Sequence, residues 1–198
     1  MENDEALIAR ALTWRYVVAL TLVAVLTTAA WVSLRLVISE QKSAAAIVNV
    51  SGRQRMLSQR TALFSSLLVT APKENRPAIR RQLKDAADLM QRSHLGLIRG
   101  NEEMGLPPTM SPIVHGMYFD GATPLDRQVE EYLKAVQALL LLKDEELGAD
   151  APLLQYIINV SPNLLVSSLD KMVRQYQSEG EEAIGRLLIA ETAVWILT

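Results

Sequence analysis

The chain has 198 residues, of which 49% are hydrophobic and 5% aromatic, and its formal net charge is −2. This composition is too apolar for a disordered chain, and the charge is too balanced for a protein that coats nucleic acid. Because the chain has no cysteine, disulfide frameworks, thiolate metal sites and cysteine nucleophiles are excluded as well.

The first predicted element is a membrane-spanning helix. Residues 16–34 (YVVALTLVAVLTTAAWVSL) contain no charged residue, and an arginine stands at each end of the run. At a rise of about 1.5 Å per residue the run spans about 28 Å, close to the hydrocarbon core of about 30 Å. A cleaved signal peptide is the alternative, but its apolar core is usually shorter. We predict an uncleaved transmembrane helix at 16–38, whose orientation the nearly equal basic residues on its two sides leave open.

The next two helices are predicted from continuity and periodicity. No proline or cluster of turn residues interrupts the chain between the apolar run and about Thr70. From about Pro77 to Arg99, residues recur at steps of three and four in the stripe of a core-facing helix, namely Ile79, Leu83, Ala86, Met90, His94 and Leu97. Gly100 then follows as a C-terminal stop.

The third and fourth helices are predicted from their first residues. Thr123 can cap a helix whose first position is Pro124, and that helix would run to Gly148. The pair Ser161-Pro162 has the same combination of cap and proline, so it predicts the start of the fourth helix.

These elements predict an all-α fold, an antiparallel up-down four-helix bundle that is continuous with the N-terminal transmembrane helix. The connection from Gly100 to Ala122 is long, and its apolar residues predict a structured cap over one end of the bundle rather than a binding loop. The apolar residues at 187–198 are too few to cross a bilayer. We interpret them as the truncated start of a second transmembrane helix.

The stretch IVNVSGRQRMLSQR (47–60) carries three arginines just beyond the apolar run. On a helix, Arg55 shares a side with mostly small residues, namely Val48, Ser51, Gly52, Ser58, Gln59 and Ala62. If this side met its own copy across a two-fold axis, two guanidiniums would face each other, and a small planar anion would turn their repulsion into charge-assisted contacts. A solvated basic face attracted to anionic lipid is the alternative that these residues leave open.

The residues VNVSGRQRMLSQR (48–60) closely resemble the motif at the start of the PilJ-type sensor domain. That domain is named for the type IV pilus chemotaxis receptor and is related to the nitrate/nitrite sensor kinases of two-component systems. Residues 107–133 resemble the long connection and third helix of such domains, and residues 169–187 resemble their fourth helix entering the second span.

The resemblance implies a bacterial inner-membrane receptor with 1–15 in the cytoplasm and a periplasmic four-helix sensor domain at 39–186. It also implies a homodimer through the first helix and a cytoplasmic output module beyond the C-terminus, of kinase, methyl-accepting or cyclic-dinucleotide type.

In the nitrate-binding members of the family, the ligand lies at the dimer axis, held by a glycine and by the arginine three residues later. The resemblance carries these roles to Gly52 and Arg55, with Asn49 and Ser51 as flanking motif positions. The nitrate kinases have neutral residues between that glycine and arginine, whereas this chain has an arginine and a glutamine there. We predict a ligand-sensing input domain that binds a small oxyanion, with nitrate or nitrite favoured, and passes a helix shift across the membrane.

An enzyme is not favoured by the residues. His94 and His115 lie on different elements without metal-ligand spacing, and His94 falls on an apolar stripe, as a packed histidine would. There is no phosphate-binding glycine loop and no serine elbow. We predict no catalytic residue, no metal, no cofactor and no nucleic acid partner. The alternative function is a membrane-anchored helical bundle that senses or binds a protein partner without a small ligand.

Overall fold

The computed structural model describes residues 2–148 and 151–197, which form helices and connections with no β-strand among them. The predicted all-α class is therefore confirmed. The chain divides into two compact units, Met1–Gln41 and Lys42–Thr198. Helix α1 (Glu2–Thr70) provides the described part of the first unit and the beginning of the second.

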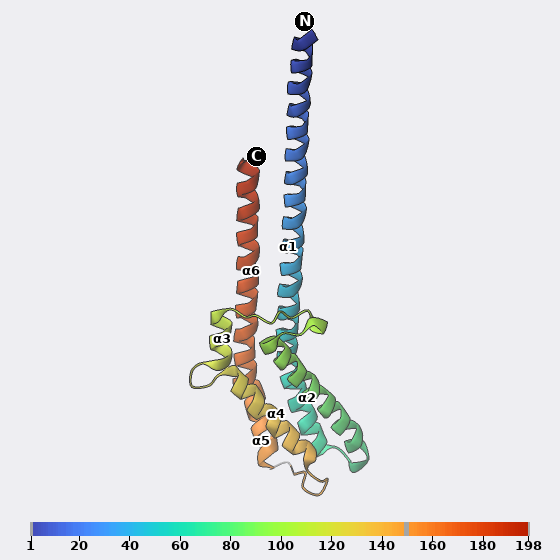
Figure 1. Cartoon of the computed structure of the whole chain (residues 1–198). Helices are drawn as coiled ribbons and strands as arrows, with labels where there is room; N and C mark the ends of the chain where they lie inside the picture. The colour runs from blue at the N-terminus through green and yellow to red at the C-terminus, as the bar shows by residue number, and fades with distance from the viewer. Residues whose placement is uncertain (1, 149–150, 198) are drawn as a thin grey trace. The chain divides into compact units, whose positions relative to one another are not determined.

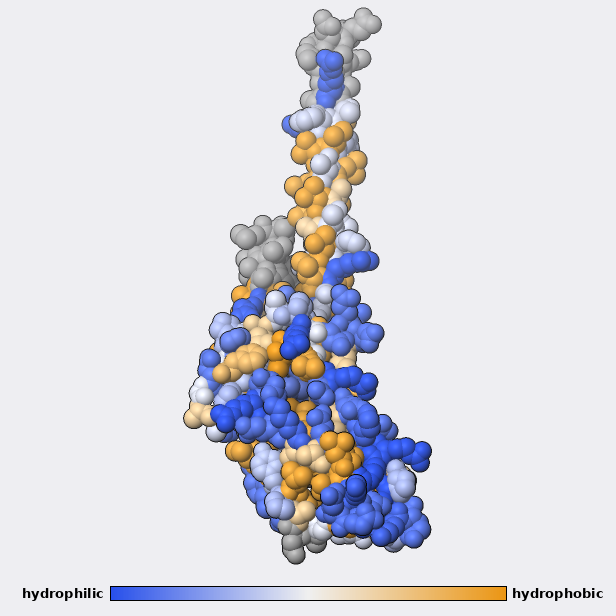
Figure 2. All heavy atoms as spheres, turned by 60° about the horizontal axis from the view of Figure 1, so that its bottom comes forward, coloured by the Kyte–Doolittle hydropathy of each residue, from blue (hydrophilic) through white to orange (hydrophobic). Residues whose placement is uncertain are grey.

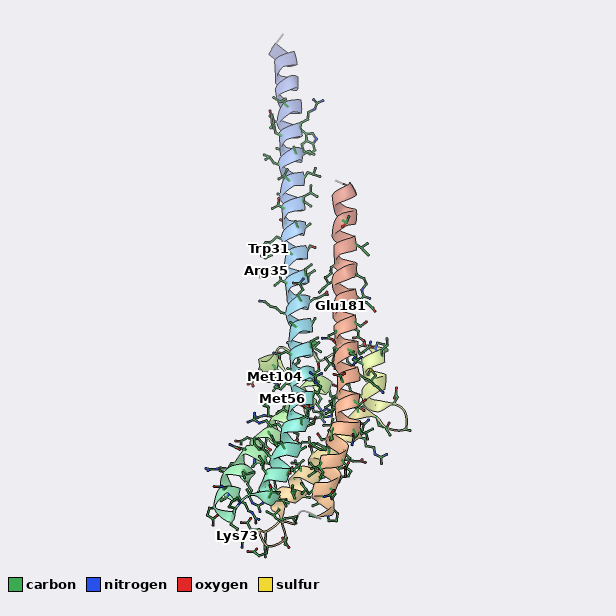
Figure 3. The ribbon with its side chains drawn as sticks, turned by 180° about the vertical axis from the view of Figure 1, so that it is seen from behind. Trp31, Arg35, Met56, Lys73, Met104 and Glu181 are labelled. Carbon is green, nitrogen blue, oxygen red and sulfur yellow. The ribbon has the colours of Figure 1, made fainter. Side chains whose placement is uncertain are left out.

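The first unit contains the apolar segment of α1. Among the described residues, α1 is the one helix that is long and apolar enough to cross a membrane, and its apolar window buries none of its residues. Figure 2 shows apolar side chains along this segment. The guanidinium of Arg35 lies 4.4 Å from the ring centroid of Trp31 (Figure 3). Such a cation–π contact suits the end of a membrane segment, where aromatic and basic side chains gather.

The second unit contains the last part of α1 together with α2 (Arg76–Arg99), α3 (Pro112–Phe119), α4 (Leu125–Leu141), α5 (Pro152–Val160) and α6 (Val166–Leu197), as Figure 1 shows. The predicted ends of α1 at Thr70 and of α2 at Arg99 are confirmed. Gly100 has φ of +82°, a conformation that favours glycine and stops the helix.

Helix α4 ends at Leu141, so the predicted end at Gly148 is wrong. Arg80 of α2 explains the earlier end, because its guanidinium donates to the carbonyl oxygens of Leu140 at 2.6 Å and Leu142 at 2.7 Å. The last turn of α4 thereby finds partners for carbonyls that a helix end leaves unpaired.

The fourth helix begins at Pro152, ten residues before its predicted first position at Pro162. Helix α5 continues through a π-helical turn (Ser161–Leu165) into α6, so the prediction that Ser161-Pro162 opens the helix is wrong. Pro162 has no backbone N–H and its ring crowds the preceding turn, and a π-helical turn is one way to absorb this irregularity. Ser161 is fully buried, and its hydroxyl donates to the carbonyl oxygen of Ser58 at 2.8 Å instead of capping a helix.

The core of the second unit lies between α1, α2, α4, α5 and α6. Its fully buried side chains come from all five of these helices, including Leu57, Leu83, Met90, Tyr132, Leu139, Ile157 and Met172, and α3 adds Val114 and Tyr118. The Tyr132 hydroxyl lies 2.8 Å from Thr61 Oγ1 and donates to the carbonyl oxygen of Ser58 at 2.9 Å. These bonds satisfy a buried phenol and tie α4 to α1.

The connection between α2 and α4 is structured, as predicted. A 3₁₀ turn (Glu102–Met104) and a single bridge between Asn101 and Leu106 precede α3. The hydroxyl of Ser111 accepts from the Val114 N–H at 3.1 Å, and it donates to the Glu179 carboxylate of α6 at 2.5 Å. The connection is therefore fastened to α6.

Candidate functional site

The predicted site residues lie on α1 in the second unit, and three of them face away from its core. Asn49 is exposed, the side chain of Arg55 is 49% exposed, and Gly52 is half-buried. Apart from the backbone of its own helix and its neighbours in the chain, a Cβ atom added at Gly52 would meet no described atom within 4 Å, so the glycine leaves open space beside Arg55 rather than contacting the chain's other helices. These three residues form what we call the outer face of the motif.

The residues that the sequence analysis grouped on one side of α1 with Arg55 do not all lie at the surface. Ser51 is only 2% exposed and its hydroxyl donates to the carbonyl oxygen of Val48 at 3.0 Å, and Ser58 is fully buried. Both serines therefore face the chain's own core, at the edge of this side next to Arg55. The reason is geometric: a side defined by steps of three and four is more than 100° wide, and the bundle covers one edge of it.

Gln54 is a motif residue whose role the sequence analysis missed. It is 1% exposed, and its side-chain amide donates to the carbonyl oxygen of Met90 on α2 at 2.8 Å. Gln54 belongs to a row of buried polar residues along α1 at steps of three and four, namely Ser51, Gln54, Ser58, Thr61 and Ser65. That spacing was the signal available in the sequence. The row shows that much of the motif serves contacts within the chain itself.

Arg55 has an intramolecular partner, the carboxylate of Asp170 on α6. Arg55 Nη1 lies 2.6 Å from Asp170 Oδ1, and Arg174 Nη2, one turn further along α6, lies 2.8 Å from Asp170 Oδ2. The guanidinium of Arg174 and then that of Arg55 lower the pKa of Asp170 below its ordinary value, so the carboxylate is ionised at neutral pH. The site is thus a cluster of two cations and one anion that joins α1 to α6.

His94 is packed in the second unit, as predicted. It is 3% exposed, and its Nε2 lies 2.7 Å from Asp126 Oδ1. Burial lowers the pKa of His94 below its ordinary value although the Asp126 carboxylate opposes this shift. Within the described residues, no group of three or more histidine, aspartate or glutamate side chains is arranged to hold a metal ion.

The chain matches the family model described as "Type IV pili methyl-accepting chemotaxis transducer N-term" over residues 36–153. That range contains the motif on α1, the connection and α4, and it ends before α6. No curated protein and no solved structure matches the chain. The apolar segment of α1 and this receptor family together indicate membrane anchoring and a role in signalling. The match covers more than half of the chain's residues, and the chain therefore belongs to the PilJ family of chemotaxis transducer N-terminal domains.

Proposed function

We propose that the chain is the input domain of a bacterial transmembrane receptor and that it binds a small oxyanion, such as nitrate or nitrite, at Arg55. The family supports a signalling role. The observation that carries the ligand is the outer face of the motif, where a half-exposed guanidinium stands beside the open space at Gly52. A guanidinium recognises planar oxyanions through parallel hydrogen bonds, and a position without a side chain gives the anion room to approach.

We propose further that the anion lies between two copies of the chain. Along the outer side of α1, residues at steps of four and three stay accessible in the protomer, namely Ala45, Asn49, Gly52, Met56, Gln59 and Leu63. Met56 and Leu63 are 45% and 56% exposed, and Figure 3 shows Met56 projecting from α1. A seam of this spacing is typical of two helices that pack along each other. Arg55 flanks the seam, so pairing would bring two copies of Arg55 to the same interface.

The helix order completes the proposal. In an antiparallel up-down arrangement, α1, α2, α4 and the continuous α5–α6 segment would be the four helices of a periplasmic sensor domain at 39–186. In that arrangement α1 and α6 would both lead to the membrane, the second through a span beginning at 187–198, where most side chains lie outside the described part of the chain. An anion at Arg55 would then move α1 relative to α6 by about 1–2 Å, the scale of known shifts between packed helices. An output module in the cytoplasm would receive that movement.

The experiment that tests the ligand is a calorimetric titration of the full chain in lipid nanodiscs with nitrate, nitrite, formate and acetate. We expect saturable heat of binding for at least one planar anion, with one anion bound per two chains. No saturable heat from any of the four anions would contradict it and would favour the alternative, in which the outer face binds a protein.

The dimer is tested by a cysteine placed on the seam. Because the chain has no cysteine of its own, Leu63→Cys would have one partner only, the same residue in a second copy. A disulfide requires Cα atoms about 4.4–6.8 Å apart, which facing seam positions can provide. We expect most of the Leu63→Cys chains in membranes to migrate as disulfide-linked dimers after mild oxidation, when measured by non-reducing electrophoresis.

The matched control for this cross-link is Leu141→Cys, on α4 and away from α1. Leu141 is 85% exposed, so a cysteine there is at least as accessible to the oxidant. We expect it to remain monomeric. Equal cross-linking at the two positions would show that random collision, and not pairing of α1, forms the disulfide.

A further inference from the structure

The carboxylate of Asp170 already occupies the guanidinium to which the proposed ligand would bind. Asp170 Oδ1 accepts from Arg55 Nη1 at 2.6 Å, a short contact between opposite charges, as in a charge-assisted hydrogen bond. Both side chains stay accessible, since 49% of Arg55 and 28% of Asp170 is exposed. The contact therefore lies at a surface that an ion from solution can reach.

A carboxylate and a small oxyanion are chemically equivalent ligands for a guanidinium, because both are planar and both present oxygen atoms that accept its N–H groups. We propose that Asp170 is the internal ligand of Arg55 in the empty site and that an incoming oxyanion binds by taking its place. Asp170 is then a residue that determines anion affinity. This inference rests on the proposed function and adds the group with which the ligand competes.

Arg174 makes the exchange feasible, because it remains bonded to the carboxylate that the anion displaces from Arg55. Its Nη2 lies 2.8 Å from Asp170 Oδ2, and the two residues are four positions apart on the same helix. Asp170 can thus release Arg55 without becoming an unpaired charge. Before the exchange, the Asp170 carboxylate of α6 pairs with Arg55 of α1 and so links the two helices. After the exchange, it pairs only with Arg174, which lies on α6 itself. Anion binding would therefore loosen a contact between these two helices.

The carboxylate of Asp170 also reduces the repulsion that two copies of Arg55 would experience near each other without a ligand. Asp170 lowers the charge of the cluster that it forms with Arg55 and Arg174 from two net positive charges to one, so the repulsion between the two copies is weakened but not removed. The empty receptor can then be a dimer, and the ligand acts on the pairing between α1 and α6 rather than on assembly.

The test is the affinity of the Asp170→Asn chain for nitrate and nitrite, measured by titration in nanodiscs beside the unchanged chain. Asparagine has nearly the same shape but no charge, so it competes weakly for Arg55 and no longer repels the anion. An exposed ion pair contributes little, so we expect the anion affinity to rise by about twofold to tenfold. Asp170→Ser, which removes the carboxylate by shortening the side chain, should also raise the anion affinity.

The matched control is Asp88→Asn, which makes the same change of net charge on α2, where Asp88 pairs with Lys84. We expect its affinity to equal that of the unchanged chain. If Asp170→Asn and Asp170→Ser leave the affinity unchanged or lower it while the unchanged chain binds, Asp170 is not a competitor and the inference is overturned, although the oxyanion site stands. If neither the unchanged chain nor Asp170→Asn binds any of the anions, the proposed function itself has failed.

Discussion

Replacement of Arg55 by alanine is expected to abolish measurable anion binding while the chain stays folded. A hydrogen bond to a charged group contributes about 1.5–3 kcal/mol, and two copies of Arg55 would each lose such bonds. Since about 1.4 kcal/mol corresponds to a tenfold change in affinity, the dissociation constant should rise by at least about 100-fold. The measurement is the same calorimetric titration, with the thermal unfolding of the variant recorded alongside it.

The matched control for Arg55→Ala is Arg60→Ala, on the same helix. Arg60 is also exposed, and its guanidinium lies 5.2 Å from the ring centroid of Phe64 in its own helix. The control removes the same charge without touching the outer face of the motif, so it should retain anion binding within about threefold, since exposed charges are largely screened. If Arg55→Ala bound the anion as the unchanged chain does, the site would be misplaced.

The largest expected effect on stability comes from Leu139→Ala in α4. Leu139 is fully buried between the helices of the second unit. Truncating such a side chain removes its transfer free energy and leaves a cavity, which together lower the free energy of unfolding by about 2–5 kcal/mol. Denaturant unfolding of the chain in detergent, followed by circular dichroism, would measure this loss as a lower midpoint.

Leu141→Ala is the control for this prediction, because it is the same substitution two residues later on α4. Leu141 is 85% exposed, and two steps along a helix turn it away from the core. We expect the free energy of unfolding to change by no more than about 0.5 kcal/mol. A comparable loss in both variants would mean that α4 does not pack through the face that carries Leu139.

The sequence by itself determined the all-α class, the apolar segment and the ends of α1 and α2. These features depend on local chemistry. An unbroken run of helix-forming residues continues α1 to Thr70, and Gly100 stops α2 because glycine adopts a positive φ without strain. The motif around Arg55 was also enough to identify the family, since its residues are contiguous in the chain.

Only the tertiary structure decided where the helices end when a distant residue intervenes. Thr123 and Pro124 placed the start of α4 one residue too early, since Pro124 is the cap and Leu125 the first helical residue. The end of α4 depends on Arg80 of α2, which donates to its last carbonyls. Likewise Ser161-Pro162 has the local chemistry of a helix start, yet the hydroxyl of Ser161 is used by the Ser58 carbonyl of α1. Local patterns predict such ends only while no other segment supplies the missing partner.

The candidate site shows the same division. The sequence placed Gly52 and Arg55 on one side of a helix, because the helical period alone relates them. It could not show that Ser51 faces the chain's own core, since that depends on where the other helices pack. Nor could it pair Arg55 with Asp170, which lies 115 positions later in the chain. The folded chain brings that carboxylate to the arginine, and long-range pairing of this kind leaves no trace in the spacing of residues along either helix.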